Sequence, residues 1–272
     1  MTINERSLPQ PIQLTVDTHR IAKLILIIAA IAEILFMVLD YHINFGEMTK
    51  IGGLRRMFNI TREDSLASWF ACTQTLMLGL TLGFIWICIK TQPDKRREAL
   101  GWLILTCFFL YMAIDDGAQI HERFGSAFKK TMQQAGNTLD FFPSYTWQIV
   151  FLPVFVGLGI FTYYFLWNQV KEHSNRILLL VSIFCFGIAV GLDFIEGLDP
   201  DHPLNIYTWI EDNTDLEYWT QQRFDEDAYK TLRHFSKSLE EAIEMFAHTL
   251  IWFVVLRQIP TLISSIKIVF PT

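Results

Sequence analysis

The chain has 272 residues, of which 51% are hydrophobic and 14% aromatic, and its formal net charge at pH 7 is −6. The apolar residues fall into blocks of roughly 20, the length at which a helix crosses about 30 Å of hydrocarbon. This grouping excludes a soluble globular domain, and the negative balance argues against a nucleic-acid partner. We therefore expect an all-α integral membrane protein whose environment is the lipid bilayer.

Six transmembrane helices are predicted, packed as a single bundle that forms a domain from 21 to 258. Their predicted limits, in chain order, are about 21–44, 66–90, 98–122, 145–167, 176–198 and 240–258. A polar N-terminal segment, 1–20, precedes the domain, and a C-terminal tail, 259–272, follows it. An extramembrane loop, 199–238, joins the last two spans, and its sequence from Asp225 onward is typical of an amphipathic helix on the membrane surface.

The first span raises the question of a signal peptide. Arg20 and Lys23 precede an apolar run, and Ala30-Ile31-Ala32 has the pattern of a cleavage site. Apolar sequence continues beyond this point as far as Leu39, so the segment is long enough to span a membrane. We expect an uncleaved first helix.

The loops give conflicting signals for orientation. The short loop 90–100 contains four basic residues, which is typical of the cytoplasmic side, but the loop 45–65 also contains four. Arg20 and Lys23, together with the acidic loop 199–238, favour cytoplasmic termini. We therefore expect both termini to be cytoplasmic.

Ionisable residues gather at one end of the predicted bundle. Odd-numbered spans finish at the surface opposite the termini, and the sixth span begins there. The acidic and histidine residues at these four helix ends are Asp40, His42, Asp115, Asp116, His121, Glu122, Asp193, Glu196, Glu240, Glu241, Glu244 and His248. Four helices that are separated in sequence thus deliver acidic residues to one leaflet, whereas spans two and four carry none.

Helical phase predicts that these side chains face a common interior. Positions seven apart in a helix differ by about 20° in direction, so Asp115 and Glu122 are expected to share a face of the third span. On the sixth span, Glu241, Glu244 and His248 fall within about 60° of one another. We therefore expect spans one, three, five and six to surround a polar pocket of carboxylates and histidine in one leaflet, with spans two and four packed outside.

Such a pocket would hold many carboxylates and almost no basic partners. An ionised carboxylate at the middle of a bilayer costs about 2.5–3.5 kcal/mol, and neighbouring like charges oppose each other's ionisation. Bound cations, protonation or water must therefore stabilise the cluster. Carboxylates combined with imidazole favour one or two divalent ions of iron, zinc or manganese, and inward Glu and His side chains of helix bundles hold such ions.

The predicted metal ligands come from all four helix ends. Those favoured most are Asp115, Glu122, Glu244 and His248. Additional or supporting ligands are Asp193, Glu196, Glu241 and Asp40.

Some of these residues also have structural explanations. Ser238 and Glu241 match a helix capping box, and Glu240 suits the start of a helix that begins near residue 240. Substitution of Glu240 is therefore expected to leave a metal bound. His121 is explained equally well as a buried histidine with a protein partner. Asp115 lies at a helix C-terminal end, where the helix dipole disfavours an anion, so capping is not expected to explain it.

The function that the sequence favours is a membrane-embedded, metal-dependent enzyme acting on a lipid-like or membrane-soluble substrate. The metal would activate water for hydrolysis or, if it is iron, dioxygen for oxidation. A cation or proton transporter or channel that uses the same carboxylates is the first alternative, although the chain shows no repeat symmetry. An accessory subunit, whose polar cluster binds a membrane protein partner, is the second.

Overall fold

The computed structural model describes residues 16–136 and 142–263, which form an all-helical structure. The predicted terminal segments 1–20 and 259–272 therefore lie largely outside the described residues. Five helices are long and apolar enough to cross a membrane, which indicates an integral membrane protein. They are α1 (Thr18–Leu39), which continues as the π-helix η1 (Asp40–Phe45), α3 (Leu66–Ile89), α4 (Arg96–Ala118), α6 (Thr146–Gln169) and α7 (His173–Glu196).

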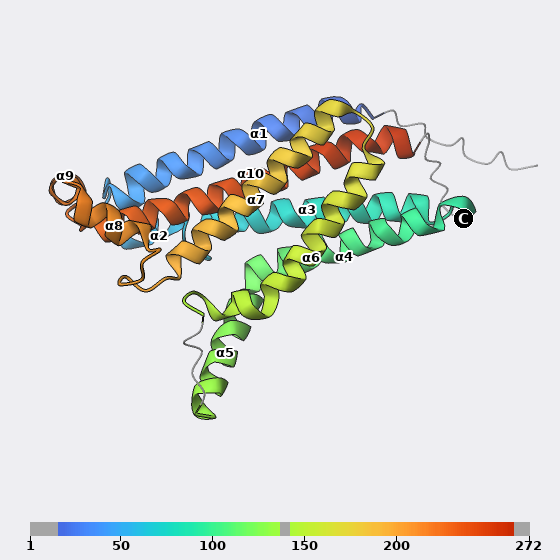
Figure 1. Cartoon of the computed structure of the whole chain (residues 1–272). Helices are drawn as coiled ribbons and strands as arrows, with labels where there is room; N and C mark the ends of the chain where they lie inside the picture. Colours follow the sequence, from blue (N-terminus) through green and yellow to red (C-terminus); the bar gives the residue numbers. More distant parts are fainter. Residues whose placement is uncertain (1–15, 137–141, 264–272) are drawn as a thin grey trace, which may run out of the picture.

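A sixth long helix, α10 (Ala228–Leu262), runs through the bundle and packs against α1, α3 and α7 (Figure 1). The remaining helical segments are shorter. They are α2 (Gly52–Phe58), η2 (Pro93–Lys95), α5 (Ile120–Gln134), α8 (Ile206–Asn213) and α9 (Leu216–Phe224). Of these, α2, α8 and α9 lie together at one end of the bundle, the end at which α10 begins (Figure 1).

The start of α10 differs from the predicted start of the sixth span. The Asp227 side chain accepts a hydrogen bond from the Lys230 backbone N–H at 2.7 Å and caps the helix there. The amphipathic segment and the sixth apolar segment are therefore one continuous helix of 35 residues. The predicted capping box is wrong, because Ser238 lies inside the helix and its hydroxyl is 3.0 Å from both Asp40 Oδ2 and the His234 carbonyl.

The close-packed core explains why α3 lies inside the bundle. Leu78, Leu82, Ile85 and Ile89 recur at helical spacing along α3 and are fully buried, as is Trp102 of the neighbouring α4. The prediction that span two packs outside the others is therefore wrong. Hydropathy identifies spans but does not distinguish a helix that faces lipid from one that faces other helices.

The outer position belongs instead to α1, which packs along α10 and leaves its other face exposed. Ile27, Ile31 and Ile34 on that face are each more than half exposed. Apolar side chains at this spacing form the surface that a transmembrane helix presents to lipid.

The third predicted span contains a break at its acidic end. Gln119 has φ 53° and ψ 43°, a left-handed conformation that ends α4, and α5 then projects away from the bundle (Figure 1). Asp115 and Glu122 therefore lie on different helices, and the prediction that they share one helix face is wrong. The Asp115 carboxylate accepts the His121 backbone N–H at 2.9 Å, so it does cap a helix, namely the one that follows.

Candidate functional site

A cavity of about 670 Å³ lies among α4, α5, α6, α7 and α10, with Ser68 and Ala71 of α3 also in its lining, and one part of the lining is strongly acidic. Because α6 lines the cavity and no residue of α1 does, the prediction that span one surrounds the pocket and span four packs outside it is wrong. The acidic part contains eight carboxylic side chains against one lysine, Lys237, and two histidines, His121 and His248. The acidic residues are Glu63, Asp115, Asp116, Glu122, Asp193, Glu240, Glu241 and Glu244. The lining therefore has a large excess of groups that need a cation or a proton.

The other part of the cavity is an apolar branch between α4, α6 and α7, with Phe108, Phe155 and Phe186 in its lining. Two further lining residues, Val156 and Ile160 of α6, are 49% and 64% exposed. These two exposed side chains place one wall of the branch at the outer surface of the bundle.

Glycines keep this branch open. Gly159 of α6 and Gly187 of α7 line the cavity, and a Cβ atom added at either position would meet no heavy atom within 4 Å. Larger side chains at these positions would extend into the space and narrow it.

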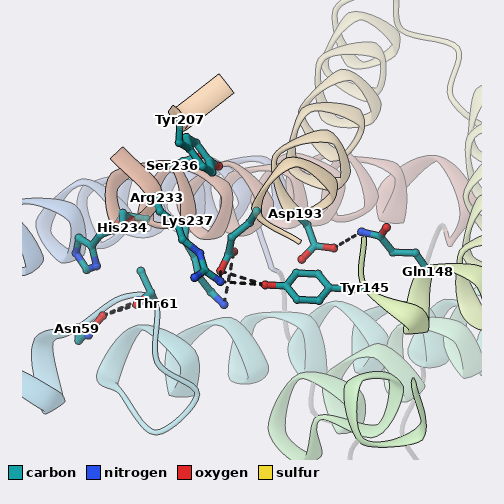
Figure 2. A network of polar contacts seen from close by, with 12 residues as sticks. Asn59, Thr61, Tyr145, Gln148, Asp193, Tyr207, Arg233, His234, Ser236 and Lys237 are labelled. Atoms are coloured by element: carbon teal, nitrogen blue, oxygen red, sulfur yellow. Dashed lines mark hydrogen bonds and ion pairs between the residues drawn. The ribbon is translucent and has the colours of Figure 1, made fainter. Parts of the chain in front are cut away.

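Three carboxylates converge where α7 ends beside α10. Asp193, Glu196 and Glu240 offer ligand atoms within 4.8 Å of one another, and they are the only such group of His, Cys, Asp or Glu among the described residues. One oxygen of Glu196 and one of Glu240 are buried without a hydrogen-bond partner in the described part of the chain. Asp193 is held by Gln148, whose Nε2 donates to Oδ2 at 2.7 Å (Figure 2). Oxygen ligands arranged in this way suit a divalent cation.

Glu240 was not expected in this group. The sequence pattern predicts a helix that starts near Glu240, but α10 begins twelve residues earlier, so Glu240 lies well inside the helix. Its side chain can then face the last turn of α7. The amphipathic pattern from Asp225 onward was the signal that the helix had already begun.

On the α4–α5 side, the Asp115 carboxylate lies 2.5 Å from Nδ1 of His121 and is fully buried. Burial disfavours a charged His121, but the hydrogen bond and charge of Asp115 outweigh burial and raise the His121 pKa. The His121 ring also packs edge-on against Trp147, with ring centroids 4.6 Å apart. These contacts match the protein partner of that alternative, but the His121 side chain is 23% exposed and therefore only partly buried.

His248 is the buried imidazole that remains available to a ligand. It is 3% exposed, and its ring packs against Phe186 with centroids 4.9 Å apart. Nδ1 lies 3.2 Å from the Glu244 carbonyl oxygen, which can only accept, so the proton sits on Nδ1. The Nε2 lone pair then has no hydrogen-bond partner among the described residues. A metal-binding histidine has this arrangement, with one nitrogen donating to a carbonyl and the other free.

The structure brings together six of the eight residues predicted as ligands. Those that line the cavity are Asp115, Glu122, Glu244, His248, Asp193 and Glu241. The favoured four do not form a group within 4.8 Å. A seventh, Glu196, belongs to the carboxylate group described above, beside the cavity lining.

Asp40, the eighth, lies elsewhere. It is 1% exposed, and its oxygens are 2.9 Å from Asn44 Nδ2 and 2.8 Å from Nε2 of His234. The Asn44 contact lies within η1, whereas the His234 contact joins η1 to α10, and Asp40 is not part of the cavity lining.

Two further features of the site were missed from the sequence. Glu63 lines the cavity from the loop before α3, and burial and the nearby Glu122 charge raise its pKa. The start of span two lies at the same surface as the ends of the odd spans, which was the available signal. The cluster also has basic partners: Arg233 Nη2 lies 3.2 Å and Lys237 Nζ 3.8 Å from the Glu196 carboxylate. Both come from 199–238, the segment that the sequence predicts as an extramembrane loop.

Residues 23–259 match the family described as Domain of unknown function (DUF8692). The matched region contains all the cavity-lining residues and the Asp193, Glu196 and Glu240 group. The comparisons with curated proteins and with solved structures found no match.

Proposed function

The chain belongs to the DUF8692 family, and we propose that it is a membrane-embedded enzyme that uses one or two divalent ions to act on a lipid-like substrate. The observation that carries this proposal is the cavity, whose acidic part is continuous with an apolar branch that has one wall at the outer surface of the bundle. An amphiphile has the same division into a polar head and an apolar chain. The head would lie among the carboxylates while the chain occupied the branch.

The membrane arrangement belongs to the same proposal. We take α10 as a sixth span over about 240–258, since a helix of 35 residues is about 52 Å long and exceeds the roughly 30 Å of hydrocarbon. Its first three turns would then extend beyond the hydrocarbon. The loop charges support cytoplasmic termini, which would place the acidic part of the cavity towards the non-cytoplasmic side.

The convergent carboxylates Asp193, Glu196 and Glu240 would hold the first ion. Glu244 and His248, with Glu241, Asp115 and Glu122, would hold a second ion or orient its water. Mixed carboxylate and imidazole ligands favour iron, zinc or manganese. The ion would activate water for hydrolysis or, if it is iron, dioxygen for oxidation.

A transporter is supported less well. A path for ions needs polar side chains through the whole thickness of the bundle. In the described structure, Leu82, Ile85 and Ile89 fill the other half of the bundle with fully buried apolar side chains.

The direct test is turnover of membrane lipids by the purified protein. A lipid extract would be incubated with the protein in detergent, with and without added iron, zinc or manganese, and the lipids followed by mass spectrometry. We expect a metal-dependent loss of one lipid class that Asp193→Asn abolishes.

The matched control is Glu33→Gln, which removes a buried carboxyl group that accepts from Thr249 at 2.7 Å and lies outside the cavity lining. This variant should retain turnover. If no lipid changes under any metal condition, or if Asp193→Asn is as active as the unaltered protein, the proposed function is wrong.

A further inference from the structure

A second cavity, of about 200 Å³, lies beside the acidic one and is mainly basic. Its lining consists of Lys230, Arg233, His234, Lys237, Thr61 and Glu196. Four of these residues come from the first turns of α10, before the predicted span. Lys237 lines both cavities, so this basic pocket borders directly on the carboxylate cluster.

Two of the basic side chains have hydrogen-bond donors to spare. Arg233 uses only Nη2, which donates to the Tyr145 hydroxyl at 3.4 Å and to Glu196 at 3.2 Å. Its Nε and Nη1 groups have no hydrogen-bond partner among the described residues. Lys237 Nζ is 3.8 Å from Glu196, which is too long for a hydrogen bond. Figure 2 shows both side chains between Thr61 and Tyr145.

The other two basic residues are already paired with carboxylates. Lys230 lies 2.9 Å from Asp227, and His234 lies 2.8 Å from Asp40. Among the described residues, Glu196 is the one carboxylate that forms ion pairs with Arg233 and Lys237, so these two side chains carry the net positive charge of the pocket lining.

From this arrangement we infer that the basic pocket binds the phosphate group of a phosphorylated lipid, and that such a lipid is the substrate class of the proposed enzyme. An arginine fork beside a lysine matches the oxygens of phosphate. Since one water occupies about 30 Å³ of liquid, a cavity of about 200 Å³ has room for a phosphate group. The substrate assignment rests on the proposed function, whereas binding of phosphate in the pocket does not.

The position of the pocket fits a lipid better than a free ion. The phosphate would lie at the extramembrane end of α10, the carboxylate cluster would follow, and the apolar branch would take the chains. The bonds beside the phosphate would then lie next to the proposed metal ligands. The metal should also strengthen phosphate binding, by about fivefold or more, because it offsets the repulsion between phosphate and carboxylates.

The experiment compares three probes with the full-length protein in detergent, by isothermal titration calorimetry: short-chain phosphatidic acid, diacylglycerol of the same chains, and inorganic phosphate. We expect phosphatidic acid to bind at least about tenfold more tightly than diacylglycerol, since each 1.4 kcal/mol of phosphate contact is tenfold. Inorganic phosphate should bind more weakly and compete with phosphatidic acid. Equal affinity for the two lipids would overturn the inference, and so would tight phosphate binding without competition.

Variants then locate the site. Arg233→Gln and Lys237→Gln should each weaken phosphatidic acid binding about tenfold, and Arg233→Lys should weaken it less because it keeps the charge. Lys129→Gln is the control, since Lys129 is exposed on α5, away from the pocket. Unchanged binding in both glutamine variants would overturn the inference. The comparison of the three probes uses the unaltered protein, so it tests phosphate recognition even if a variant does not fold.

Metal content measured on the same samples separates the two proposals. If the protein holds no metal but binds phosphatidic acid in a way that depends on Arg233, the phosphate site is supported and the proposed enzyme is ruled out. A protein that holds stoichiometric metal but does not prefer phosphatidic acid would rule out the phosphate site and leave the proposed enzyme standing.

Discussion

At one end of the bundle, Ile85, Ile89 and Trp102 are fully buried, and α3, α4 and α10 pack closely around them. At the other end, α4 and α10 join α6 and α7 around a cavity of about 670 Å³ with eight carboxylic side chains in its lining. The same helices thus form a dense apolar core and, a few turns away, an open and highly charged space. Close packing is the ordinary state of a protein interior, so the open end is the part that needs a functional explanation.

The comparison assigns stability to the apolar end and ligand binding to the acidic end. Substitutions at the first should change the free energy of unfolding and leave ligand binding per folded molecule unchanged. Substitutions at the second should change ligand binding, and should change the free energy of unfolding only through the loss of bound ligand.

The largest effect is expected at the apolar end. Trp102→Ala removes a fully buried indole and should lower the free energy of unfolding by about 3–5 kcal/mol, because the cavity it leaves closes only in part. Denaturant unfolding in detergent micelles measures this. Metal content of the folded fraction should stay the same. A Trp102→Ala protein as stable as the unaltered one would show that this end does not carry the fold.

The next effect comes from the ligand. A divalent ion at a hundred times its dissociation constant should stabilise the folded protein by about 2.7 kcal/mol, because it binds only the folded state. Melting temperatures with and without chelator and added iron, zinc or manganese provide the measurement. The increment should be the same in Trp102→Ala. If none of these ions shifts the melting temperature, the acidic end is neutralised by protons instead.

Blocking the apolar branch should reduce turnover without affecting metal. Gly187→Leu places a large side chain in the branch, so kcat/KM for a lipid substrate should fall at least about tenfold, equivalent to about 1.4 kcal/mol. Gly191→Leu is the control, since Gly191 is equally open, lies one turn further along α7 and does not line the cavity. Equal losses in the two variants would mean that lipid does not enter by this route.

The smallest effect is expected for Asp64, a surface carboxylate outside the cavity that pairs with Arg56 and Arg62. Hydrogen bonds from Arg56 and Arg62 lower the Asp64 pKa from 3.8 to about 2. A lowered carboxyl pKa stabilises the folded state above pH 3.8, and this contribution disappears as the pH falls towards 2. The melting temperature should therefore drop slightly in Asp64→Asn above about pH 4, and the two proteins should converge near pH 2. Salt should reduce the difference. A difference that persists at pH 2 would contradict this assignment.

The helical membrane architecture could be predicted because it depends on composition and length. The span predicted at 66–90 corresponds to α3 at Leu66–Ile89, for example. Which helix lies inside could not be predicted, since α3 and α6 are both apolar and differ only in their neighbours. The break at Gln119 could not be predicted either, because glutamine has no preference for the left-handed conformation. The contact between Asp115 and His121 spans the break, and the sequence does not reveal this contact.

The candidate site was predictable as a region and less so in its geometry. Counting acidic residues at helix ends predicted which side chains gather at one end of the bundle, because topology alone decides which helix ends meet there. The grouping of Glu240 with Asp193 and Glu196 depends on the true start of α10, which the apolar pattern placed too late. Lys237 and Arg233 were missed for the same reason.

The central claim, that the acidic end binds divalent cations, is tested most directly by elemental analysis of the detergent-purified protein. We expect one or two equivalents of iron, zinc or manganese in the unaltered protein and in Glu33→Gln, whose carboxyl group is buried away from the cavity. Asp193→Asn and Glu240→Gln should each lose most of the metal. An unaltered protein without metal after loading, or an Asp193→Asn protein that retains it in full, would contradict the account.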